Sequence, residues 1–329
     1  MKRTQQILSA VLVVQMVLIA VVFWPRGSVS GDESRLLLDG IEAADVVALT
    51  ITDVDERTIE IRRGVDGGWM LPDSGEYPVE EEKVTALLDK LAAINTGRLV
   101  TRTAGSHKRL QVAANDFMRR VAVETTDGGQ RVIYLGSSPS YGTIHVRAEG
   151  ENEAYLTGAV SSWEVNATIT SWIDTSYLSV ASEDLVALML KNPNGQWSFE
   201  KDGEGNWTMV DLPAGEMLDE SGVTALVNQA RWMNMVRPLG KQADASYGLD
   251  QPAGTLTLQT ADRTITVAIG AKSAEDNTYV VKSSESPYYV RVSEYSVQGL
   301  LEKSREDFIL EPTPVPEEVT PTPEDESEG

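Results

Sequence analysis

The 329-residue chain carries 28 lysines and arginines against 50 aspartates and glutamates, a formal net charge of −22. A strongly negative protein repels phosphate backbones, so the composition argues against nucleic-acid binding. The chain has no cysteine, which excludes disulfides, zinc–thiolate sites, thiol nucleophiles and acylation of a lipoprotein cysteine.

The chain opens on an apolar run. Residues 7–24 carry no charge and follow Lys2 and Arg3. As a helix this run would span ~27 Å, close to a ~30 Å hydrocarbon core, with the basic residues on the cytoplasmic side. We therefore expect residues 1–30 to form a cytoplasmic stub and a transmembrane anchor, with the rest of the chain outside the membrane. The alternative is a cleaved secretory signal ending at Ser28-Val29-Ser30, which would also export the chain.

After a polar linker at residues 31–44, the first folded segment alternates apolar and polar residues. Gly67-Gly68 is a hairpin turn signal before Trp69. In residues 80–94 the apolar positions fall at helical spacing, and Glu80 to Glu82 suit the positive end of the helix dipole. The predicted elements are strands at 46–52, 58–62 and Trp69, a helix at 80–94, and strands at 120–125, 131–135, 143–147 and 153–156.

The same order then repeats. Asp45–Leu49 is echoed by Asp184–Leu188, and Val84–Leu88 by Val223–Val227, each 139 residues later. A period this long indicates two domain-sized copies, at residues 45–180 and 181–310. The second copy predicts strands at 184–190, 196–201 and 206–210, a helix from 219 to about 234, strands at 255–260, 263–269, 278–283 and 287–292, and a closing helix at 297–303.

These patterns predict an α+β fold: two homologous domains of antiparallel sheet with packed helices, preceded by one transmembrane helix. The alternation in the strands indicates that each sheet has one face in water. Residues 311–329 are rich in proline, threonine and acids, a composition that predicts a disordered tail.

No catalytic, cofactor or metal site is evident. His107 lies in a basic loop, and His145 lies on an alternating strand with its side chain expected toward solvent. No Gly-x-Ser-x-Gly elbow or phosphate loop occurs. The acidic stretch from Asp202 to Asn206 resembles the start of a calcium loop but has Pro213 at the twelfth position, so we interpret it as a hairpin turn. The acids at Asp53–Glu56 are likewise interpreted as a turn.

Tryptophans and one basic cluster are the remaining candidates. Trp69 and Trp207 are repeat-equivalent and are predicted to be core residues, whereas tryptophans exposed together on one face would indicate carbohydrate binding. Six basic residues within 23 positions of the first copy form a candidate contact for an acidic partner or anionic lipid: Arg98, Arg102, Lys108, Arg109, Arg119 and Arg120.

Several motifs together carry a family resemblance. They are Gly68-Trp69-x-Leu71, Asn206-Trp207-x-Met209, Tyr247-Gly-Leu-Asp-x-Pro252 and Ile269-Gly270. Over about residues 45–309 the chain resembles the bacterial domain-of-unknown-function 4340 family, although the first copy has Leu110–Asp116 in place of the Tyr-Gly-Leu-Asp-x-Pro motif. The resemblance implies one N-terminal anchor helix and, for some members, partnership with transporters similar to gliding-motility ABC exporters. It implies no activity and no site residues.

The sequence therefore favours a non-enzymatic, membrane-anchored extracytoplasmic accessory or scaffolding protein that contacts a membrane complex, such as an ABC-type transporter. No cofactor is expected, and the sequence does not indicate a small-molecule ligand. The alternatives are an envelope carbohydrate-binding protein and an envelope hydrolase. The first requires exposed tryptophans, and the second requires acids that converge in a cleft.

Overall fold

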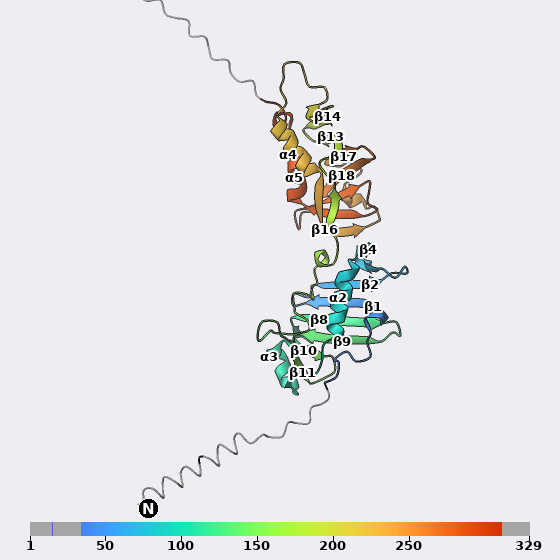
Figure 1. Ribbon diagram of the computed structural model, residues 1–329, viewed down its shortest axis with the longest axis vertical. Coiled ribbons are helices and arrows are strands. Elements are labelled where there is room, and N and C mark those ends of the chain that lie inside the picture. Colours follow the sequence, from blue (N-terminus) through green and yellow to red (C-terminus); the bar gives the residue numbers. More distant parts are fainter. Residues whose placement is uncertain (1–14, 16–33, 311–329) are drawn as a thin grey trace, which may run out of the picture. The chain divides into compact units, whose positions relative to one another are not determined.

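The computed structural model describes residue 15 and residues 34–310 (Figure 1). Within this part the chain forms two compact units. Unit 1 holds residues 34–71 and 78–172, and unit 2 holds residues 72–77 and 173–310.

Unit 1 is built on a nine-stranded antiparallel sheet in the order β4-β3-β2-β1-β8-β9-β10-β11-β5. Its apolar residues pair across the central strands, for example Leu49 with Val123 and Ile51 with Val121. The strands of this sheet are β1 (Val46–Asp53), β2 (Thr58–Arg63), β3 (Trp69–Leu71), β4 (Tyr77–Pro78), β5 (Leu99–Thr101), β8 (Arg119–Thr125), β9 (Gln130–Leu135), β10 (Ile144–Ala148) and β11 (Ala154–Thr157), and β6 (Val112–Ala113) and β7 (Asp116–Phe117) form a separate two-stranded sheet.

Both faces of the unit 1 sheet are covered. Helix α2 (Glu81–Ala92) lies across one face (Figure 1), where Leu88 and Leu91 share a small cavity with Val46 and Val123. On the other face the short helix α3 (His107–Leu110) and β6 form a second cluster of buried residues: Leu110, Val112, Ala122, Val132, Tyr134 and Ala154. The central strands are therefore buried on both sides.

Unit 2 has a second nine-stranded antiparallel sheet in the order β12-β16-β20-β19-β18-β17-β13-β14-β15. Leucines pair across its centre, Leu188 with Leu258 and Leu190 with Leu256. Its strands are β12 (Ser176–Ser179), β13 (Leu185–Asn192), β14 (Gly195–Lys201), β15 (Trp207–Met209), β16 (Trp232–Gly240), β17 (Gly254–Thr260), β18 (Thr264–Lys272), β19 (Thr278–Ser283) and β20 (Tyr289–Ser293).

Helices α4 (Glu220–Ala230) and α5 (Glu294–Glu302) pack beside each other on this sheet (Figure 1). Each buries one stripe: Val223, Leu226, Val227 and Ala230 on α4, and Val297 and Leu300 on α5. The Asp219 carboxylate caps the N-terminus of α4 by accepting a hydrogen bond from the Ser221 amide at 2.9 Å.

The two large sheets share a strand order. Taken along the sheet, β3-β2-β1-β8-β9-β10-β11-β5 in unit 1 corresponds to β15-β14-β13-β17-β18-β19-β20-β16 in unit 2, and each sheet has one further edge strand, β4 or β12. Strands β1 to β3 in unit 1 and β13 to β15 in unit 2 form a meander, a helix follows, and the next strand of the shared order, β5 or β16, lies on the opposite side of the sheet.

The predicted α+β class is wrong. The described chain is predominantly antiparallel β-sheet, and α2 to α5 are few and short. The predicted transmembrane helix lies in residues 1–30, outside the described residues apart from residue 15. Among the described residues, no helix combines the length and apolar character needed to cross a bilayer.

The helix predicted from residue 219 is shorter in the structure than expected. It was expected to reach about residue 234, but α4 ends at Ala230 and β16 starts at Trp232. The cause is a change of period: Met233 and Met235 are buried while Trp232 and Asn234 are exposed, the alternation of a strand. Helix α2 lies within its predicted range of 80–94, and α5 starts at Glu294, earlier than predicted.

The paired tryptophans behave differently. Trp69 is buried, as predicted, with the Arg63 guanidinium 4.6 Å from its ring centre. Trp207 is only partly buried, with Lys201 Nζ 5.4 Å from its ring centre. The prediction that both are core residues is therefore confirmed for Trp69 and wrong for Trp207.

Candidate functional site

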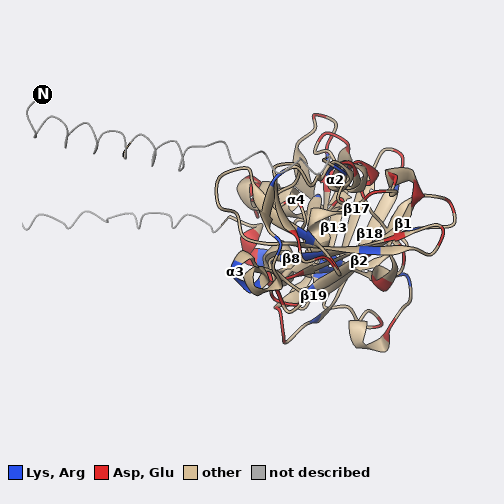
Figure 2. Cartoon of the chain, turned by 90° about the horizontal axis from the view of Figure 1, so that it is seen from below, with Lys and Arg blue, Asp and Glu red and all other residues tan. Residues whose placement is uncertain are grey.

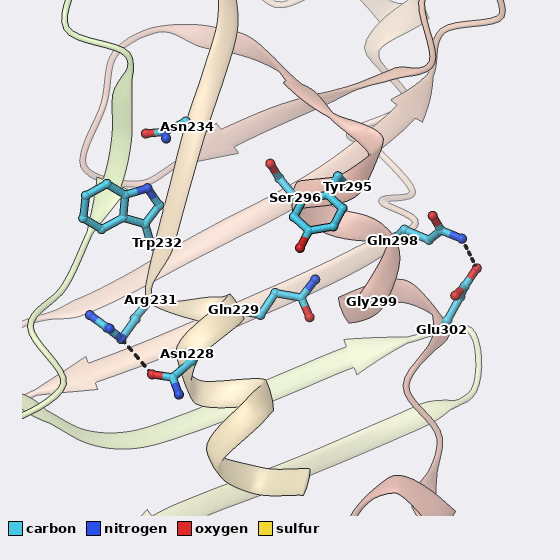
Figure 3. A pocket seen from close by; sticks show the side chains of 10 residues that line it. All are labelled: Asn228, Gln229, Arg231, Trp232, Asn234, Tyr295, Ser296, Gln298, Gly299 and Glu302. Carbon is cyan, nitrogen blue, oxygen red and sulfur yellow. Dashed lines mark hydrogen bonds between the residues drawn. The ribbon is translucent and has the colours of Figure 1, made fainter. Parts of the chain in front are cut away.

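A groove in unit 2 is the strongest candidate site. It has a volume of about 800 Å³ and lies where α4 ends, β16 begins and α5 passes alongside. Figure 3 shows Trp232 and Asn234 on the β16 side and Tyr295 on the α5 side. The residues that line it are Asn228, Gln229, Arg231, Trp232, Asn234, Tyr295, Ser296, Gln298, Gly299 and Glu302.

The β16 wall follows from strand alternation. Because Met233 and Met235 point into the core, their neighbours Trp232 and Asn234 must point to the other side. Trp232 is 52% exposed despite its size. Residues 232–234 of the strand pair with β12, and β20 pairs with the strand from Met235 onward.

The α5 wall follows from helical spacing. Val297 and Leu300 are buried, which turns Tyr295, Gln298 and Glu302 outward. Gln298 Nε2 donates to Glu302 Oε1 at 2.7 Å, a contact one helical turn apart. Tyr295 is 90% exposed.

The floor of the groove holds amide groups. Arg231 Nε donates to Asn228 Oδ1 at 3.2 Å (Figure 3). Within residues 34–310, no hydrogen bond engages the side-chain amides of Gln229 and Asn234. The charged side chains that line the groove have no net charge, because Arg231 and Glu302 contribute one charge of each sign.

Unit 1 has a smaller pocket, about 350 Å³, between α2 and the segment after β11. Lys90, which aligns with Gln229 at the repeat offset of 139, forms an ion pair there with Glu164. Trp172 Nε1 donates to the Asn166 carbonyl at 2.7 Å. Lys90 and Glu164 thus neutralise each other in this pocket, while Trp163 is 75% exposed at its edge.

The predicted basic cluster separates into two groups. Four of its members are exposed on one continuous segment that runs from the start of β5 through α3: Arg98, Arg102, Lys108 and Arg109. Arg102 Nη1 lies 3.9 Å from Glu153 Oε1. Figure 2 shows basic residues on α3. We call this exposed segment the basic corner.

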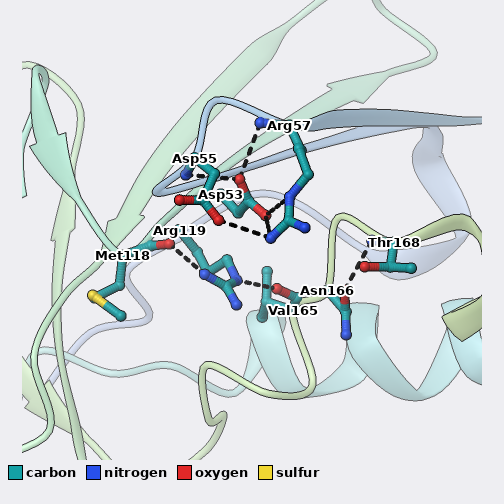
Figure 4. Close-up of polar contacts among 8 residues, drawn as sticks. All are labelled: Asp53, Asp55, Arg57, Met118, Arg119, Val165, Asn166 and Thr168. Carbon is teal, nitrogen blue, oxygen red and sulfur yellow. Dashed lines mark hydrogen bonds and ion pairs between the residues drawn. The ribbon is translucent and has the colours of Figure 1, made fainter. Parts of the chain in front are cut away.

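Arg119 and Arg120 lie on β8 and do not belong to this corner. Arg119 Nε donates to the Val165 carbonyl and Nη1 to the Met118 carbonyl, each at 2.7 Å (Figure 4). These contacts give Arg119 a structural role in holding the loop after β11. Both arginines are half-buried, and the Arg120 guanidinium counteracts the rise in the pKa of Tyr134 that burial causes.

The expectation that His145 faces solvent is wrong. Its side chain is buried, with Nδ1 3.1 Å from Ser137 Oγ, and burial together with the nearby Arg109 charge lowers its pKa. The cause is the cover that α3 and β6 give to this face of the sheet. His107 is buried too, and its Nε2 lies 2.9 Å from the Asn152 carbonyl oxygen.

Both acidic turns are confirmed as turns. Asp53 accepts hydrogen bonds from the Asp55 and Arg57 amides and from Arg57 Nε (Figure 4). Asp202 accepts the amides of Glu204 and Asn206 at 2.9 Å, closing the β14–β15 hairpin. Within residues 34–310, no three acidic or histidine side chains gather as a metal site would require.

Sequence reasoning missed the groove. Neither of its aromatic residues, Trp232 and Tyr295, was assigned a role from the sequence. The alternation Trp232-Met-Asn-Met235 could have indicated the groove, because it directs the tryptophan and the asparagine to one side of a strand. These residues were instead assigned to the preceding helix.

Comparison with known proteins identifies one family. A family model described as "Domain of unknown function (DUF4340)" matches residues 69–246, a stretch that begins at β3 of unit 1 and ends before β17 of unit 2. No curated protein and no solved structure matches the chain. Since the matched stretch covers more than half of the sequence, the chain belongs to the DUF4340 family.

Proposed function

We propose that this protein is a non-enzymatic accessory or scaffolding protein, held at the cell membrane by its N-terminal segment with units 1 and 2 outside, and associated with an ABC-type transporter complex. The location rests on the uncharged run of residues 7–24 after Lys2 and Arg3. The transporter association rests on the family resemblance.

The α4–β16–α5 groove carries the binding role. Its lining supplies aromatic surface, amides and hydroxyls, which are groups that recognise a ligand. Its only ionisable side chains of opposite charge, Arg231 and Glu302, each form a hydrogen bond to a neighbouring amide. The chemistry of the groove therefore supports binding more than proton transfer.

The shared strand order also supports an origin by duplication, with one copy in each unit. Under this proposal unit 1 keeps a smaller pocket, with Lys90 paired to Glu164, and unit 2 keeps a larger one. The two copies would have separate tasks: unit 1 presents the basic corner and unit 2 presents the groove.

The test uses the full chain with a C-terminal tag in the producing bacterium. We expect the protein to remain with membranes after alkaline carbonate extraction and to be cut by protease added outside spheroplasts. It should also co-purify with a permease and an ATPase after gentle solubilisation. A soluble mature chain starting at Gly31, protection from external protease, or a tagged protein that repeatedly purifies without transporter subunits would contradict the proposal.

A further inference from the structure

We propose that the α4–β16–α5 groove binds a neutral carbohydrate, with a sugar ring stacked on Trp232 and its hydroxyls bonded to the amides of the groove. This inference rests on the proposed binding function and names its ligand class.

Aromatic side chains in water are the first reason. Trp232 is 52% exposed and Tyr295 is 90% exposed, and they stand on opposite walls of the groove (Figure 3). Large aromatic surfaces left in water mark binding sites more often than chance, because covering them is favourable. The apolar C–H face of a pyranose ring is flat and matches such a surface.

The amides are the second reason. An amide side chain both donates and accepts hydrogen bonds, which is what a hydroxyl group requires of its partner. Gln229 and Asn234 have no such partner within residues 34–310, and Asn228 and Gln298 lie beside them. The lining is electrically balanced, so it favours an uncharged ligand over an acidic one.

A glycine in the wall is the third reason. A Cβ on Gly299 would lie 2.6 Å from Gln229 Oε1. Glycine inside a helix costs about 1 kcal/mol relative to alanine. At this position it leaves room for the Gln229 amide to lie against α5 with its polar end in the groove.

Unit 1 provides the internal comparison. There the residue equivalent to Gln229 is Lys90, whose ion pair with Glu164 satisfies its charge, and the Trp172 indole is bonded to the Asn166 carbonyl. The space is less than half as large. Of these two pockets, the unit 2 groove is the larger and has exposed aromatic side chains on two walls, Trp232 and Tyr295, so it is the one assigned a ligand.

A peptide ligand fits the groove less well. Peptides commonly add to a free strand edge, but residues 232–234 of β16 offer such an edge over only three residues, because β20 pairs with the strand from Met235 onward. The two walls also lack an enclosed apolar pocket, since the core residues Met233, Val297 and Leu300 are fully buried beneath them.

The experiment is isothermal titration calorimetry of the full chain in nanodiscs. The probes are three neutral oligosaccharides, namely cellohexaose, maltohexaose and N-acetylated chitohexaose, with polygalacturonate as the acidic comparison. We expect at least one neutral oligosaccharide to bind. Trp232→Ala should then weaken binding about tenfold or more, which corresponds to about 1.4 kcal/mol. Gln229→Leu should weaken it while leaving the melting temperature near that of the parent.

Trp163→Ala is the matched control, because it removes another exposed tryptophan, one at the edge of the unit 1 pocket. It should leave the affinity unchanged. The inference is overturned if none of the three neutral oligosaccharides binds, if only polygalacturonate binds, or if folded Trp232→Ala retains the parental affinity. Membrane retention and transporter co-purification are measured on the same variants. If these persist while glycan binding fails, only the ligand class is wrong.

Discussion

A Cβ atom on Gly270 would lie 2.1 Å from the carbonyl oxygen of Tyr247. Unit 1 has the same relationship, since a Cβ on Gly136 would lie 2.0 Å from the Leu110 carbonyl oxygen. In each case the carbonyl belongs to a short helical turn that ends in a left-handed residue, Gly248 in unit 2 and Gln111 in unit 1. The Tyr-Gly-Leu motif is therefore a turn packed against a strand, and unit 1 has the same geometry with a different sequence.

These close approaches predict that adding one methyl group at either glycine destabilises the fold. We expect Gly270→Ala to lower the free energy of unfolding of unit 2, and Gly136→Ala that of unit 1, by about 1–3 kcal/mol, because backbone must move to relieve the overlap. Urea unfolding of each variant measures the loss. Gly203→Ala is the control, since open space surrounds its Cβ position. Equal stability of all three variants would contradict the steric explanation.

The two repeat-equivalent tryptophans should differ in their contribution to stability. Trp69→Ala removes a buried side chain and should destabilise unit 1 by about 3–5 kcal/mol. Trp207→Ala removes a partly exposed one and should cost about half as much or less. Thermal or urea unfolding decides this. Similar losses for both would show that the exposure of Trp207 is not maintained in solution.

The Asp53 turn should make unit 1 sensitive to acid. Burial raises the pKa of Asp53, but hydrogen bonds from the Arg57 amide and side chain and from the Asp55 amide outweigh this, so the pKa lies below its ordinary value. A depressed carboxyl pKa stabilises the folded state above the unfolded-state pKa, and this stability is lost as the pH falls through the folded-state pKa.

The matching variant is Asp53→Asn, which keeps the shape of the side chain and removes its charge. At neutral pH it should lose about 1–3 kcal/mol, because Arg57 loses its carboxylate partner. The difference from the parent should shrink as the pH falls below about 4. A difference that stays constant from pH 7 to pH 3 would show that the Asp53 charge does not stabilise the fold.

The basic corner should bind through charge. Replacing Lys108 and Arg109 with glutamate is expected to abolish binding to anionic liposomes, or co-purification of an acidic partner, without changing the melting temperature, since both side chains are exposed. Binding by the parent should also weaken as salt rises, because exposed charges are screened over ~8 Å at physiological ionic strength. Glutamate at the exposed Arg131 and Lys191 is the charge-matched control. If both double variants bind like the parent, the corner is an ordinary solvated surface.

Local signals in the sequence were sufficient for most of the elements. The apolar spacing of Val84, Leu87, Leu88 and Leu91 predicted helix α2, and these four residues are its buried face. Alternation predicted the strands on either side of the Asp202 hairpin. Such signals are reliable because they reflect repeats of 3.6 or 2 residues in the local backbone.

Which faces of a sheet are covered by other segments could not be predicted from local patterns. The alternation around His145 indicated a solvent-exposed face, but α3 and β6, which come from about 35 residues earlier, cover it and bury both His145 and Arg147. Arg147 Nε donates to the Val112 carbonyl at 2.7 Å, a partner that no local pattern reveals.

The sequence by itself determined the order of strands and helices, the turns, the apolar N-terminal run and the absence of cysteine chemistry. Each of these follows from composition or from a local pattern of residues along the chain. Only the tertiary structure decided that the class is predominantly β, that Arg119 is tied to backbone carbonyls, and that Trp232 faces Tyr295 across a groove. Each of these depends on segments brought together from distant positions, where packing rather than local periodicity selects which side chains are buried and which remain open to a ligand.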